Sequence, residues 1–128
     1  MSTLKVTNIQ ATGETASRAV SGVAAAWANF TGTGTATIND SVNHSSLVDN
    51  ATGNYTLNLA NSMDNTSYSF CYTGKRSSGN DLIFVTQQNA TDLATGSYRP
   101  RSFHFTHTTS PVGEDAGKVG TSIHGDLA

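Results

Sequence analysis

Charged side chains are scarce in this sequence. They make up 12% of its 128 residues, whereas soluble domains average about 25%, and the net charge is only −2. Such a surface offers little electrostatic attraction to a nucleic-acid backbone or to an anionic membrane. The chain also has no apolar stretch long enough to cross a bilayer and no apolar secretion signal at its N-terminus. We therefore expect no nucleic-acid partner, no membrane insertion, and synthesis in the cytoplasm without a signal peptide.

Cysteine is almost absent. The single cysteine, Cys71, cannot form a disulfide within the chain, so a disulfide framework is excluded. It lies in the segment Tyr68-Ser69-Phe70-Cys71-Tyr72, where no base or cation flanks it. We interpret Cys71 as a small buried side chain rather than a reactive thiol.

Large apolar residues are few as well. Leu, Ile, Val and Phe together make up about a fifth of the chain, a level at which disorder becomes possible. Disorder also requires a high net charge and few aromatic residues, and this sequence has neither. The composition therefore predicts a thin core that closes fully only when a neighbouring chain covers part of it, which indicates an oligomer.

The patterns of catalytic and cofactor sites are missing. There is no Gly-x-Ser-x-Gly segment and no phosphate-binding glycine loop, and the acidic residues are scattered through expected loops. His104 and His107 have a spacing that suits a metal on a helix, but on a strand they point to opposite faces. With His44 and His124 in other elements, we interpret the histidines as structural or surface residues. The alternative is an ion on an oligomer axis with one histidine from each copy. We expect no enzyme activity, no cofactor and no metal site.

What the sequence has in abundance is Ser, Thr and Asn, roughly a third of the chain, together with 12 Gly. Threonine favours strands, and Ser, Asn and Gly favour turns. Apolar residues alternate with polar ones over several short segments, which we expect to be strands: Leu4–Ile9, Thr33–Ile38, Val42–Val48, Tyr55–Leu59, Tyr68–Tyr72, Leu82–Val85, Phe103–Phe105 and Val119–Ile123.

The strand pattern predicts a single all-β domain over residues 1–128, an antiparallel jelly-roll-like β-sandwich of about seven to nine short strands. Residues 1–25 are a candidate anchoring or trimerising segment, and residues 26–128 form the sandwich. We expect a hairpin from Val42–Val48 and Tyr55–Leu59 with a long polar connection. The unbroken apolar run Leu82–Val85 is typical of a strand buried on both faces.

Individual side chains are assigned to the core or to the surface from this pattern. The large apolar residues expected to anchor the core are Trp27, Phe30, Ile38, Leu57, Phe70 and Phe84. The residues expected on exposed contact loops are Lys75, Arg76, Asn80, Tyr98 and Arg99. We interpret the basic residues as solvated loop charges, and contact with an acidic partner is the alternative. If exposed, Trp27, Tyr55 or Tyr98 could instead stack on sugar rings, but we interpret Trp27 as a core anchor.

One segment resembles a known family. Residues 26–35 read Ala-Trp-Ala-Asn-Phe-Thr-Gly-Thr-Gly-Thr, and they are followed by turn formers between residues 40 and 54. This pattern resembles the A-W-x-N-F-x-G-T-G-T segment of tail-fibre-like and related virion structural proteins of tailed phages. The resemblance implies a virion component made in the host cytoplasm, a homotrimer mounted on a tail or capsid beside other virion proteins. It supplies no catalytic residues, and this chain lacks the coiled coil and long stalk of extended fibres.

The leading hypothesis is a short tail-fibre or tail-appendage component. On this hypothesis residues 75–80 and 91–100 face outward and contact host-surface glycans. One alternative is a capsid decoration or cement protein, which needs no host contact. The other is a free carbohydrate-binding module, which would be monomeric and would bind sugar by itself.

Overall fold

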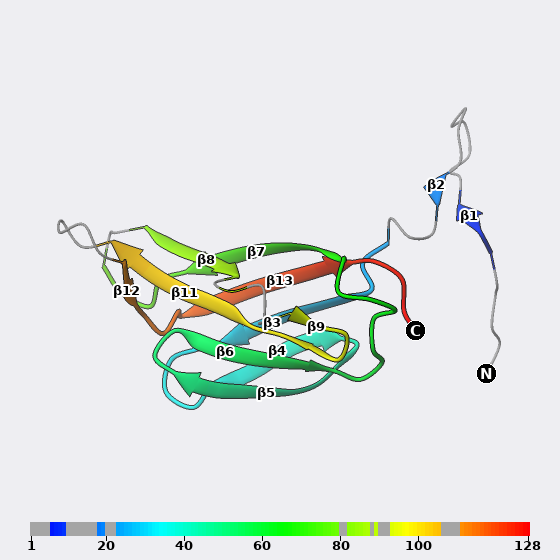
Figure 1. The fold of residues 1–128 in the computed structure, drawn as a ribbon. Coiled ribbons are helices and arrows are strands. Elements are labelled where there is room, and N and C mark those ends of the chain that lie inside the picture. The colour runs from blue at the N-terminus through cyan, green and yellow to red at the C-terminus, as the bar shows by residue number, and fades with distance from the viewer. Residues whose placement is uncertain are drawn as a thin grey trace.

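The protein folds into two antiparallel β-sheets that pack face to face (Figure 1). The structure is a computed structural model that describes residues 6–9, 18–19, 23–79, 82–87, 89, 93–105 and 111–128. Within these ranges there is no helix, and strands are joined by turns and short loops. The predicted all-β antiparallel sandwich is confirmed.

The first sheet has four strands in the order β4–β3–β13–β7. Their bounds are Thr37–Val42 for β4, Ala26–Thr31 for β3, Lys118–His124 for β13 and Ser69–Lys75 for β7. Side chains alternate strictly along β3 and β13, with every second residue buried, because successive residues of a strand point to opposite faces. The predicted last strand with Val119, Thr121 and Ile123 is confirmed, and these three residues lie on its buried face.

The second sheet has seven strands, several of them short. They are β5 (His44–Ala51), β6 (Asn54–Leu59), β8 (Ile83–Gln87), β9 (Leu93–Ala94), β10 (Ser97–Tyr98), β11 (Pro100–Phe105) and β12 (Pro111–Gly113). Strands β10 and β11 are separated only by Arg99, and both pair with β6. On its other flank β11 pairs with β8 over five residues.

The remaining two strands, β1 (Asn8–Ile9) and β2 (Arg18–Ala19), pair with each other and lie to one side of the two large sheets in Figure 1. Most of the candidate anchoring segment, residues 1–25, lies outside the described residues. The described chain thus contains thirteen strands, more than the seven to nine expected. The excess arises partly because β9 and β10 occupy a polar stretch that composition indicates to be a loop.

The core lies between the sheets and is built around aromatic rings. Phe30 and Tyr55 meet edge to face with ring centroids 5.1 Å apart, and both are fully buried. Leu57 is also fully buried, as predicted, and the predicted anchor Ile38 is half-buried against this cluster. A side chain at position 32 would meet the Tyr55 hydroxyl, so only glycine lets the β3–β4 turn approach the core.

Three expected strand boundaries are wrong. The segment Thr33–Ile38 is mostly the turn between β3 and β4, where Gly34 has a φ of 68°. Val42–Val48 is broken at Asn43, whose φ is 60°, and there the chain passes from the first sheet to the second. The hairpin of β5 and β6 does form, but its connection is two residues, Thr52 and Gly53, because pairing continues through Ala51. Periodicity alone does not detect such tight turns.

The apolar run Leu82–Val85 is not buried on both faces. Ile83 and Val85 face the first sheet, where they lie against Gly74. Leu82 and Phe84, on the other hand, are 74% and 43% exposed. Only one face of β8 is covered because the sandwich has two layers, and a strand buried on both sides needs three.

Candidate functional site

Three phenylalanine rings gather on the outer face of the second sheet. Phe84 on β8 and Phe103 on β11 are cross-strand partners, and their rings stack with centroids 5.8 Å apart. Phe105 meets both rings edge to face, at 5.5 Å from Phe84 and 5.6 Å from Phe103. Phe84 and Phe105 remain 43% and 47% exposed. We call these three residues the aromatic patch.

The patch points outward because β11 turns its polar residues inward. Ser102 is buried and His104 is half-buried between the sheets, so the period of two places Phe103 and Phe105 on the outside. The predicted core anchor Phe84 is therefore wrong, since it lies opposite Phe103 on the outer face. The sequence shows this alternation, but it does not show that the polar set is the inner one.

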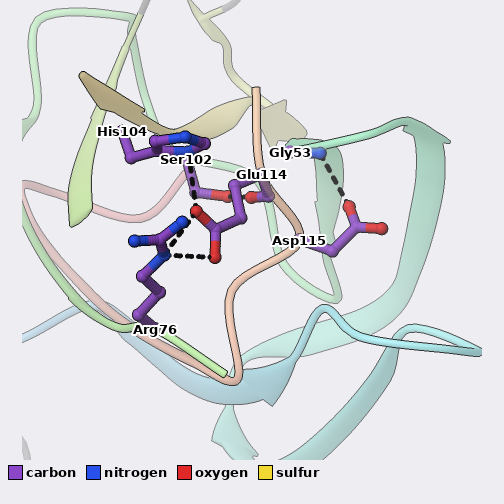
Figure 2. A network of polar contacts seen from close by, with 6 residues as sticks. All are labelled: Gly53, Arg76, Ser102, His104, Glu114 and Asp115. Carbon is purple, nitrogen blue, oxygen red and sulfur yellow. Dashed lines mark hydrogen bonds and ion pairs between the residues drawn. The ribbon is translucent and has the colours of Figure 1, made fainter. Parts of the chain in front are cut away.

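A polar network explains why Ser102 and His104 are inside (Figure 2). The Arg76 Nε lies 2.7 and 2.8 Å from the two carboxylate oxygens of Glu114. One of these oxygens also lies 2.7 Å from His104 Nδ1, although the two atoms do not form a hydrogen bond. The Ser102 hydroxyl donates to the Glu114 carbonyl at 2.6 Å. The network joins the end of β7 to β11 and to the loop before β13.

The neighbouring residue, Asp115, secures the β5–β6 hairpin. Its carboxylate accepts hydrogen bonds from the Gly53 backbone N–H at 2.7 Å and from the Tyr55 hydroxyl at 3.0 Å. Burial, followed by the bond to Asp115, raises the pKa of Tyr55 well above its usual value. Both carboxylates of the loop are thus held by groups of the protein itself. The arrangement clamps the loop before β13 against the β5–β6 hairpin and the end of β7.

The residues expected on contact loops are dispersed. Lys75 and Arg99 are exposed, whereas Arg76 is largely covered by its pairing with Glu114. Lys75 and Arg76 border a depression of about 390 Å³, and Arg99 donates to the Thr56 hydroxyl across the second sheet. Asn80 lies outside the described residues.

The expectation that Tyr98 is exposed is wrong, because it is fully buried. Its hydroxyl contacts both His44 Nε2 and Thr121 Oγ1 at 2.7 Å, so the polar end of the ring is satisfied inside the sandwich. Burial raises the pKa of Tyr98 strongly, and the hydroxyl stays protonated.

Three assignments on the first sheet are also wrong. Trp27 is not a core anchor, since it alternates with the buried Ala26 and Ala28 and lies on the outer face. Phe70 is 37% exposed because β7 is the edge strand, where its ring stacks on Tyr72 rather than entering the core. Cys71 is exposed, not buried.

Comparison with known proteins finds no matching family model, no similar curated protein and no similar solved structure.

The described parts of the chain contain neither a metal-binding cluster nor a membrane-spanning helix. No three His, Cys, Asp or Glu side chains there lie close enough together to hold a metal ion. His107, one of the histidines considered above, lies outside the described residues. The same parts contain no helix with the length and hydropathy needed to cross a membrane.

Proposed function

We propose that this chain is a structural subunit of a tailed-phage virion, a short tail fibre or tail appendage that assembles as a homotrimer and contacts the host surface. The resemblance of residues 26–35 to tail-fibre-like proteins supports the virion setting. The aromatic patch is the observation that supports self-assembly of the chain. Exposed clusters of large apolar rings on a small domain mark surfaces that associate.

The energetic argument rests on the three rings of the patch. Full burial of a phenylalanine side chain stabilises by about 1.5–3 kcal/mol relative to exposure. Phe84 and Phe105 are 43% and 47% exposed, so a copy that covers the exposed part of both rings gains about 1–3 kcal/mol. Pro111 on the adjacent strand β12 is exposed and pairs in register with Phe105, so it extends the apolar area. The occupant we propose for this area is a second copy of the chain.

Light scattering tests the assembly. We expect the purified protein to have a mass three times 13.4 kDa, and we expect Phe84→Ser combined with Phe105→Ser to reduce it to a monomer. The matched control is Val48→Ser, which removes an apolar side chain that is 45% exposed on β5, away from the patch. A wild-type monomer, or a trimer that survives the double substitution, contradicts the proposal.

The location in the particle is tested separately. Antibody labelling of intact virions distinguishes a tail appendage, present in a few copies at one vertex, from a capsid decoration, present over the whole head. Labelling of the head overturns the tail assignment and favours the decoration alternative. A chain that is absent from the virion overturns the virion role.

A further inference from the structure

The outer face of the first sheet carries a tryptophan in a row of small residues. Trp27 pairs in register with Val42 on β4 and with Ser122 on β13, and Ser122 pairs in turn with Cys71 on β7. The next row holds Asn29, Gly120 and Thr73. The two rows together form a flat surface, opposite in the fold to the aromatic patch.

This surface is hollowed beside the indole. A shallow depression of about 280 Å³ lies there, close to the lower limit of small-molecule sites. Its lining consists only of uncharged residues: Trp27, Ala28, Asn29, Cys71, Thr73, Gly120, Thr121 and Ser122. A Cβ at Gly120 would lie 2.6 Å from the Thr73 hydroxyl, so the depression depends on the absence of a side chain at this position.

The indole of Trp27 has no bonding partner among the residues that the structure describes. Among the described residues no aromatic ring packs on Trp27, and no side chain or backbone group hydrogen-bonds its N–H. Tyr98, in contrast, has its hydroxyl bound on two sides. A large half-buried ring with its polar group still available is typical of a binding surface, because the ring offers apolar area and a donor at once.

From these observations we infer that the depression beside Trp27 binds a neutral saccharide, with the indole stacking on a sugar ring and Asn29, Thr73 and Ser122 bonding its hydroxyls. A sugar ring has an apolar face and a rim of hydroxyl groups, and this surface offers an aromatic face with amide and hydroxyl groups around it. The inference deepens the proposed attachment role, and its biological meaning as host contact rests on that role.

The charges around the depression favour a neutral ligand. Asp40 on β4 pairs in register with Asn29 and brings a carboxylate to the margin. Among the described residues the nearest lysine or arginine side chains on this face are Lys75 and Lys118, which pair with each other two positions beyond Thr73 and Gly120. An anionic sugar would therefore meet a carboxylate before it met a cation.

Tryptophan fluorescence gives a direct test, because Trp27 is the only tryptophan of the chain. The probes are linear neutral oligosaccharides of glucose, galactose and N-acetylglucosamine, chosen from a glycan array, with a uronic-acid oligomer for comparison. We expect at least one neutral probe to shift the Trp27 emission in a saturable way and the uronic-acid oligomer to give no shift. Calorimetry on the same probe should show at least about tenfold weaker binding for Trp27→Ala, a difference of about 1.4 kcal/mol.

Cys71 supplies a second readout and a matched control. It is exposed on the rim of the depression and is the only thiol, so the bound saccharide should slow its reaction with a maleimide. Asn29→Ala should weaken binding, whereas Thr86→Ala, an exposed residue on the other sheet, should not.

Each contrary result overturns the inference. No binding to any neutral probe, preference for the uronic-acid oligomer, or binding that leaves the Trp27 emission unchanged excludes a neutral-saccharide site here. An emission that shifts with protein concentration in the absence of sugar shows that a second copy covers Trp27 instead. If the protein is a trimer but binds no sugar, only the saccharide inference is overturned. If the protein binds sugar as a monomer, only the proposal of assembly is overturned.

Discussion

The Tyr98 hydroxyl and His44 Nε2 lie 2.7 Å apart, and they come from β10 and β5, the strands on either side of β6. The other ring nitrogen of His44 lies 2.9 Å from the Val42 carbonyl, which can only accept, so Nδ1 carries the proton and Nε2 accepts from Tyr98. The Tyr98 oxygen can then accept from Thr121. This chain of hydrogen bonds requires His44 to be neutral.

The first prediction follows from that requirement. Burial, opposed in part by bonds to the Val42 and Trp27 carbonyls, lowers the pKa of His44 below its usual 6.5. As the pH falls below 6.5 the unfolded chain takes up this proton before the folded chain does, so the free energy of unfolding decreases. Thermal unfolding between pH 7.5 and 5.5 should show this decrease, and His44→Gln, which does not titrate, should reduce it.

The matched control is His124→Gln. His124 bonds Ser122 near the end of β13, away from the Tyr98 hydroxyl. The pH dependence should persist in this variant. An unchanged pH dependence in His44→Gln would show that other groups cause it.

The second prediction concerns the clamp around Glu114. Glu114→Gln removes the carboxylate charge that the partly buried Arg76 guanidinium contacts, so we expect the free energy of unfolding to drop by about 1–3 kcal/mol. Because the two residues contact each other directly, Arg76→Gln in the same chain should add less than its separate effect. Urea denaturation of the two single variants and the double variant measures this coupling.

Asp40→Asn is the control for removing a carboxylate, since Asp40 is exposed. It should change stability by no more than about 0.5 kcal/mol. Full additivity of the Glu114 and Arg76 substitutions would show that the pair does not act as a unit.

The same clamp shows what the sequence can and cannot predict. The all-β antiparallel class and the last strand over Val119–Ile123 follow from local composition and alternation, and both predictions are confirmed. Which face of β11 is inside depends on contacts with Glu114, which lies on another segment. The Glu114 carbonyl accepts from Ser102, and its carboxylate lies between Arg76 and His104. The rule that large apolar residues are buried therefore placed Phe84 in the core and Tyr98 on the surface, whereas the structure has the reverse. Tertiary pairing of polar groups, which is not visible in local sequence, reversed the assignment.

The last prediction compares two neighbouring aromatic residues of β3. Phe30 is fully buried against Tyr55, so Phe30→Ala should lower the free energy of unfolding by about 3–5 kcal/mol. Trp27 has a larger ring but lies on the outer face, so Trp27→Ala should cost only about 1–2 kcal/mol, from partial loss of apolar contact. Chemical denaturation of the two variants, at a protein concentration where the oligomeric state is unchanged, measures both values. If Trp27→Ala lowered the free energy of unfolding more than Phe30→Ala, the Trp27 ring would belong to a buried interface, either within the subunit or between copies.

A tryptophan whose removal changes the free energy of unfolding only slightly is available for binding a ligand. The order of the two free-energy changes therefore matters more than either value alone.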